Sequence, residues 1–260
     1  MTRLAITAVK GMRLRTVEEI ELEHNGARGD RAFYVIDARD QMINGKGYGR
    51  LQAVLADYDD GADTLTLTFP DGAAAGGTLE HGPAISTRFY SRQATGRLVF
   101  GPWAEALSGY LGQPVRLIES GGGVDRGLRG ATSLISRASL TRLAEVGEQG
   151  EVDPRRFRML IEIDGVDAHA EDRWIDRDLR VGDAMLRMNG HIGRCLITSR
   201  DPDTGEIDLP TLEFLREYRR ELEFEATEPL PFGIYGEVLV PGAVRIGDAV
   251  GVEGREPQGE

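Results

Sequence analysis

The sequence has a single cysteine, Cys195, among its 260 residues. A lone cysteine cannot form an internal disulfide, and an iron–sulfur cluster needs about four thiolates. Electrons for any redox reaction would therefore have to come from another protein. Lysine is almost as scarce, because only Lys10 and Lys46 are present. Pyridoxal phosphate requires a lysine for its Schiff base, and neither lysine lies in a context that suggests one, so we do not expect this cofactor.

Long hydrophobic runs are also absent. No stretch approaches the ~18 apolar residues of a transmembrane helix. The first ten residues lack the apolar length and the cleavage site of a secretory signal. We therefore expect a cytoplasmic protein that does not bind a membrane. The formal net charge of −12 argues against nucleic acid as a partner, because a phosphate-backbone binder normally carries a basic face.

The four histidines do not have the spacing of a zinc site, so no metal cage built from protein ligands alone is expected. These residues are His24, His81, His169 and His191.

Apolar residues alternate with polar ones over many short segments, which is typical of β-strands. Strands are predicted at 4–10, 17–22, 32–37, 64–69, 114–118 and 156–163. Helices are predicted at 103–111, at 210–222 and after the capping residue Ser136. The glycine- and alanine-rich residues 71–78 are predicted to form a loop. The sequence thus predicts a mainly β chain with a few helices, of the α+β class.

A glycine-rich stretch within residues 119–130 is the predicted domain boundary. It divides the chain into residues 1–118 and 119–254, and residues 255–260 are predicted to be a disordered tail.

Cys195 begins a short apolar and β-branched run that ends at the turn-forming Asp201–Gly205. We predict that it lies on one arm of a hairpin. On such a strand His191 would lie about 13 Å away at ~3.3 Å per residue, too far for a hydrogen bond. A Cys–His nucleophile pair is therefore only a minor alternative, which would need a bulge. A buried structural cysteine is the other interpretation.

Three segments together resemble one known family: Arg194-Cys195, the Asp-Pro-Asp-Thr-Gly turn at 201–205, and Pro241-Gly-Ala-Val-Arg-Ile-Gly-Asp248. The chain resembles the molybdenum-cofactor sulfurase C-terminal (MOSC) domain family, and within it the amidoxime-reducing component family. Its first half is similar to the β-rich domain that accompanies the MOSC domain. The resemblance implies a MOSC-type β-barrel preceded by this second β domain.

The resemblance also implies a molybdenum cofactor (molybdopterin), with Cys195 as the thiolate ligand of the metal. Thiolates suit soft metals, and cationic side chains form strong hydrogen bonds to phosphate. The implied cofactor contacts are Lys10, Gly11, Arg31, Arg129, Gly130, Arg158 and Arg194, and Lys46 is implied at the pocket rim. Without the resemblance, Lys10 and Arg31 would be interpreted as exposed charges at strand ends.

Several positions depart from the family pattern. Gly11 replaces a serine, Gly193 replaces the serine of the nearest relatives, and Met159-Leu160 replaces a Pro-Asn pair. The lost asparagine removes an amide from a polar site.

The reaction that the resemblance implies is the reduction of N-hydroxylated compounds, such as amidoximes, hydroxylamines and N-hydroxy bases, by oxygen-atom transfer. Its partners would be a small N-hydroxylated substrate and a separate electron-transfer protein. Two alternatives are a carrier of the cofactor or its sulfur without turnover, and a degenerate barrel that binds another small ligand. The sequence does not indicate an oligomeric state.

Overall fold

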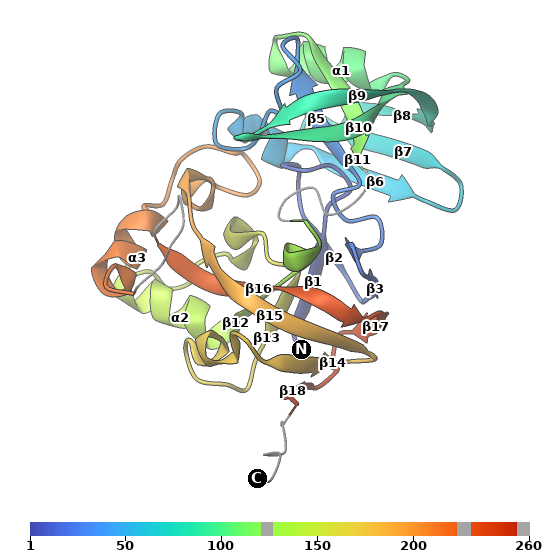
Figure 1. Cartoon of the computed structure of the whole chain (residues 1–260). Helices are drawn as coiled ribbons and strands as arrows, with labels where there is room; N and C mark the ends of the chain where they lie inside the picture. Colours follow the sequence, from blue (N-terminus) through green and yellow to red (C-terminus); the bar gives the residue numbers. More distant parts are fainter. Residues whose placement is uncertain (121–126, 223–229, 254–260) are drawn as a thin grey trace.

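The computed structural model describes residues 1–120, 127–222 and 230–253. The predicted tail and part of the predicted boundary loop lie outside these ranges. The chain is mainly β, with three α-helices in its described part (Figure 1). The predicted fold class is therefore confirmed. None of the described helices is long and apolar enough to span a membrane.

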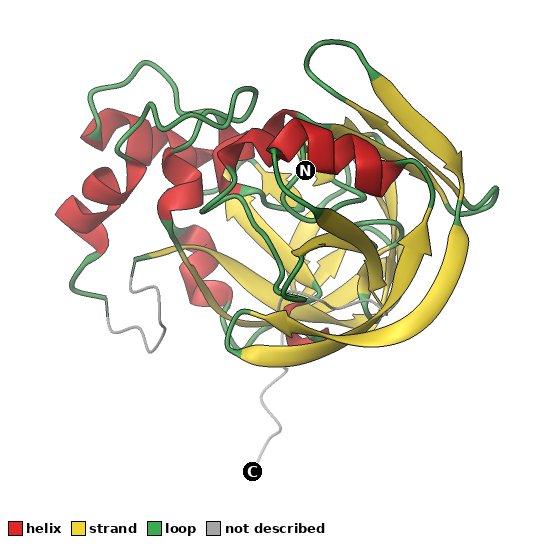
Figure 2. Ribbon diagram, turned by 90° about the horizontal axis from the view of Figure 1, so that it is seen from above, coloured by secondary structure: helices red, strands yellow, loops and turns green. Residues whose placement is uncertain are grey.

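An eight-stranded sheet forms the lower half of the molecule in Figure 1. Its strand order is β18-β14-β15-β16-β12-β13-β1-β2, and only β12 and β13 run parallel. The strands are β1 (Arg3–Ile6), β2 (Arg15–Val17), β12 (Thr132–Ser136), β13 (Ile161–Ile163), β14 (Asp178–Val181), β15 (Ala184–Gly193), β16 (Pro231–Val240) and β18 (Val250–Val252). Figure 2 shows that the strands curl around the molecule and do not form a flat layer.

Three smaller sheets complete the β structure. Two of them belong to the upper half of Figure 1, and the third, β17-β3-β4, joins segments from both ends of the chain. Their strands are β3 (Glu19–Glu23), β4 (Gly26–Ala27), β5 (Phe33–Asp37), β6 (Leu55–Asp59), β7 (Thr64–Thr68), β8 (Ala74–Thr78), β9 (Glu80–Phe89), β10 (Arg92–Phe100), β11 (Val115–Ser120) and β17 (Gly242–Arg245).

The helices are those that the sequence predicts. α1 (Trp103–Leu111) covers the upper half, and its buried Trp103 and Leu107 belong to that core. α2 (Arg137–Val146) and α3 (Thr211–Arg219) pack against each other beside the large sheet. Ser136 caps α2 as predicted, because its side chain accepts a hydrogen bond from the Ser139 amide.

The first two strands of the chain belong to the large sheet. β1 pairs with β13, so that Arg3 lies opposite Glu162, and its other edge pairs with β2. After β1 the chain crosses to the upper half, where Val9 forms a parallel bridge with Phe33. The segment that carries Lys10 and Gly11 therefore lies between the two halves. The predicted division at residue 118 stays a prediction, and structurally the two halves share strands.

Two segments differ from the sequence prediction. The predicted loop at 71–78 contains strand β8, which pairs with β7. Gly76 allows this pairing, because a Cβ there would lie 2.8 Å from Thr66 Oγ1. The predicted strand at 156–163 is strand only from Ile161, since it is preceded by the 3₁₀ helix η3 (Pro154–Phe157) and by Arg158 in a left-handed conformation.

Candidate functional site

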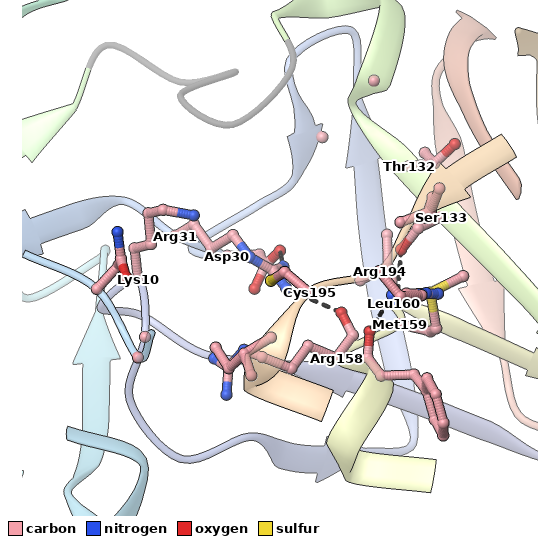
Figure 3. A pocket seen from close by; sticks show the side chains of 18 of the residues that line it. Lys10, Asp30, Arg31, Thr132, Ser133, Arg158, Met159, Leu160, Arg194 and Cys195 are labelled. Carbon is pink, nitrogen blue, oxygen red and sulfur yellow. Dashed lines mark hydrogen bonds and ion pairs between the residues drawn. The ribbon is translucent and has the colours of Figure 1, made fainter. Parts of the chain in front are cut away.

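A pocket of about 410 Å³ lies between the two halves, a volume typical of small-molecule sites. Its wall comes from segments far apart in the sequence (Figure 3). Seven of the eight predicted site residues line it: Lys10, Gly11, Arg31, Gly130, Arg158, Arg194 and Cys195. Arg129 is not among the lining residues. Its carbonyl instead accepts a hydrogen bond from the Asn189 side chain.

Cys195 does not lie on a strand, and this prediction was wrong. β15 ends at Gly193, and the Cys195 backbone is extended at the start of the 3₁₀ helix η5 (Leu196–Ser199). Its carbonyl accepts hydrogen bonds from the amide and the hydroxyl of Thr198, which close the helical turn. The predicted turn after it is present, because the Gly205 amide donates to Asp201 O at 2.8 Å. The thiol is partly buried and faces the pocket.

Arg31 and Arg158 lie side by side at the pocket and are held by hydrogen bonds to backbone carbonyls. Arg31 forms an ion pair with Asp30, and its Nη2 donates to the Arg158 carbonyl at 3.0 Å. Arg158 Nη2 in turn donates to the Met12 carbonyl at 2.7 Å. Both residues have positive φ angles, 52° and 54°, which are uncommon for non-glycine residues and occur often at functional sites.

Lys10 also lines the pocket, and its ammonium group lies against two aromatic rings. Its Nζ is 5.6 Å from the centre of the Phe89 ring and 5.8 Å from that of Tyr90, within the range of cation–π attraction. Tyr90 lies between β9 and β10 and lines the pocket. Sequence reasoning missed Tyr90, and no signal in the sequence around it could have placed it near Lys10.

Arg194 is buried, and its guanidinium faces backbone carbonyls. Nε donates to Phe232 O at 2.7 Å and Nη1 donates to Phe157 O at 2.9 Å. These bonds join β16 to the end of η3 directly behind Cys195. Its predicted contact with a cofactor stays a prediction, while the contacts in the structure support the pocket wall.

Met159 and Leu160 form an apolar part of the wall, on the other side of Cys195 from Lys10 and Arg31 in Figure 3. Leu160 is 2% exposed and belongs to the core of the large sheet. Its amide donates to Ser133 Oγ at 3.0 Å. The position where the family has asparagine is therefore a packing position in this chain.

His191 pairs with Asp172, whereas Cys195 was the partner considered for it from the sequence. Its Nε2 lies 3.2 Å from Asp172 Oδ1, and it is not among the residues that line the pocket. Across the described residues, no group of three histidine, cysteine or acidic side chains could hold a metal ion. A metal bound in this pocket would need ligands in addition to the side chains that the structure describes.

The side chains of the pocket fit a cofactor that brings such ligands. One thiol can ligate a soft metal, the side chains of Lys10, Arg31 and Arg158 can bind an anionic group, and the pocket is large enough for an organic molecule.

Two family models cover most of the sequence. The MOSC domain matches residues 121–251, and the MOSC N-terminal beta barrel domain matches residues 1–114. The chain belongs to the MOSC domain family. The resemblance noted in the sequence is thereby confirmed, and the pocket of this MOSC protein lies where its two matched regions meet.

Among curated proteins, this MOSC protein is similar to mitochondrial amidoxime-reducing components. It is 37% identical to component 1 from Homo sapiens over 122 residues, which are 45% of this chain and 35% of that protein. The chain thus spans about a third of the length of that relative. It is 27% identical to component 1 from Xenopus laevis over 96% of this chain and 81% of that protein.

Among solved structures, the chain is similar to the YUAD protein from Bacillus subtilis. The superposition covers 96% of this chain and 94% of the YUAD chain. The TM-score is 0.42 and the sequence identity is 12%.

Proposed function

We propose that this MOSC protein binds a molybdenum cofactor through Cys195 and reduces N-hydroxylated compounds. One observation carries the proposal: the only thiol of the chain faces a pocket that is also lined by Lys10, Arg31 and Arg158. These four residues come from four separate segments of the chain. The relatives are amidoxime-reducing components, and an amidoxime is an N-hydroxylated compound, which supports this choice of substrate.

Each residue has a distinct role in this proposal. The Cys195 thiolate ligates the metal, and Lys10, Arg31 and Arg158 bind the anionic part of the cofactor by charge-assisted hydrogen bonds. Arg194 fixes the backbone around Cys195 through the carbonyls of Phe157 and Phe232. Met159 and Leu160 keep water away from one side of the pocket.

When bound, the cofactor would supply the oxygen-atom transfer, which the side chains present cannot perform. The substrate R–NHOH would take up two electrons and two protons and become R–NH₂ and water. The electrons would come from a separate electron-transfer protein.

The decisive experiment is metal analysis of the chain purified from a host that makes molybdenum cofactor, with Cys195→Ser as the variant. We expect about one molybdenum per wild-type chain and none in the variant, because Cys195 is the only residue of the chain that can supply a thiolate. Thermal unfolding of both proteins checks that the variant is folded. Absence of molybdenum from folded wild-type protein would contradict the proposal.

Turnover distinguishes a reductase from a carrier. With a chemical reductant, the loaded protein should convert benzamidoxime to benzamidine over many cycles. Molybdenum without turnover, together with activation of a client enzyme, would instead show a protein that carries the cofactor or its sulfur.

A further inference from the structure

Two loops from opposite halves of the molecule pack together beside the pocket with almost no space between their backbones. The first, residues 44–49, lies in the upper half, and the second, residues 195–205, begins at Cys195. A Cβ on Gly49 would lie 2.1 Å from Gly205 O, and a Cβ on Gly205 would lie 2.0 Å from Gly49 O. Nearer the pocket, a Cβ on Gly45 would lie 2.6 Å from Ile197 Cδ1. At Gly49 and at Gly205 the closest atom is a backbone atom, so a larger residue there requires movement of a loop, whereas at Gly45 the Ile197 side chain would have to shift.

Arg200 joins the same two loops by hydrogen bonds. Its Nη1 donates to Gly205 O and its Nη2 donates to Lys46 O, each at 2.7 Å. The guanidinium thus holds the turn after Cys195 on one side and the pocket-lining Lys46 on the other. Two donors in a fixed plane are a property of arginine that lysine does not share.

Farther along the second loop, ion pairs link it to the segments that carry Arg158 and Lys10. Asp203 forms ion pairs with Arg155, at 2.8 Å, and with Arg13, at 3.2 Å. Arg155 precedes Arg158 by three residues, and Arg13 follows Lys10 by three residues. The loop that starts at the thiol is therefore attached to residues 44–49 and to the segments that carry Lys10 and Arg158.

We propose that these contacts, which we call the loop clasp (residues 44–49 with 195–205), position Cys195 within the pocket. Gly49 and Arg200 are its positioning residues, and neither needs to touch a substrate. The inference deepens the proposed function, on which it rests for the role of the thiol. If the clasp opens, the thiol becomes more accessible and is no longer fixed opposite Lys10, Arg31 and Arg158.

Because Cys195 is the only thiol, its rate of alkylation by iodoacetamide reports directly on the clasp. The full chain is produced in a host that cannot make molybdopterin, so the measurement does not depend on the cofactor. The test variant is Gly49→Ala. Its matched control is Gly47→Ala in the same loop, where an added Cβ meets nothing within 4 Å.

We expect alkylation of Gly49→Ala to be on the order of tenfold faster than that of the wild type, since local opening governs access to a partly buried group. Gly47→Ala should match the wild type. Gly242→Ala tests general loosening, because its Cβ would lie 2.8 Å from Asp183 O at the start of β17, and Gly242 does not line the pocket. It should lower the melting temperature without accelerating alkylation.

Equal rates for Gly49→Ala and Gly47→Ala would overturn the proposal, and so would equal acceleration in Gly242→Ala. If Gly49→Ala does not fold, Arg200→Lys serves as a second variant. It should accelerate alkylation severalfold, while Arg142→Lys, at an exposed ion pair on α2, should not. A wild type that binds no molybdenum would refute the proposed function, yet the alkylation rates would still decide whether the clasp positions the thiol.

Discussion

At the scale of single residues, His81 has a carboxylate at each ring nitrogen. Its Nε2 lies 2.8 Å from Asp63 Oδ2 and its Nδ1 lies 3.1 Å from Glu119 Oε2. The hydrogen bond to Asp63 raises the pKa of His81 above its usual 6.5, and Glu119 adds to this effect against the opposing cost of burial. The charged ring links the β6–β7 turn to β9 and β11.

We therefore predict a pH-dependent contribution of His81 to stability. Because the folded-state pKa is raised, the contribution is complete below pH 6.5 and is lost as the pH rises through the folded-state pKa. The free energy of unfolding of wild type should exceed that of His81→Gln by up to about 1 kcal/mol at low pH, as for other partly exposed ion pairs. Urea unfolding of both proteins across this range measures the difference. A difference that is independent of pH would contradict the prediction.

At the scale of one element, helix α1 has one glycine in its interior and one just after its last residue, and these have opposite roles. Gly112 ends the helix in the left-handed region, with φ 72° and ψ 21°, and its amide donates to Ser108 O at 2.9 Å. Gly109 lies inside the helix. A Cβ would meet nothing within 4 Å at either position, so only the backbone conformation differs.

The same substitution at these two glycines should therefore change stability in opposite directions. Gly112→Ala should lower the free energy of unfolding by about 1 kcal/mol, because alanine is strained in the left-handed region. Gly109→Ala should raise it by roughly 0.5–1 kcal/mol, because glycine weakens a helix interior. Urea unfolding of both variants measures these changes. Destabilisation by Gly109→Ala would contradict the prediction, because it would mean that the added methyl group is not tolerated at this position of the helix surface.

At the scale of the whole molecule, the amino-terminal strands complete the sheet of the carboxyl-terminal half. Leu4 on β1 is fully buried in the core of that sheet, and β3 pairs with β17. Without these strands, β13 and β17 would each present an unpaired edge, and apolar core surface would be exposed to water.

A fragment of residues 119–260 should therefore lack a cooperative thermal transition, although it contains the whole matched MOSC domain. Adding a separately produced fragment of residues 1–118 should restore the transition, because it supplies β1, β2 and β3. Near-ultraviolet circular dichroism and calorimetry measure both outcomes. Cooperative unfolding of the 119–260 fragment alone, near the melting temperature of the full chain, would refute this.

Most of the secondary structure could be predicted because its signals are local. The alternation in Thr64–Thr68 predicts a strand, and Ser136 and Gly112 mark the ends of helices. The errors occur where tertiary contacts override these signals. Strand β8 exists because β7 supplies a partner, and the run after Cys195 becomes a 3₁₀ helix packed against residues 44–49.

The sequence by itself determined that the chain has one thiol and two lysines, that it is mainly β and that it resembles the MOSC family. Only the tertiary structure decided which cations line the same pocket as that thiol. Arg31 and Arg158, for example, are 127 positions apart, and yet the Arg31 side chain donates a hydrogen bond to the Arg158 carbonyl. It also decided that Arg194 binds carbonyls and that Gly49 lies against Gly205. The physical reason is that periodicity along a strand records which face is buried, whereas the partners of a guanidinium or a glycine are defined only when distant segments pack together.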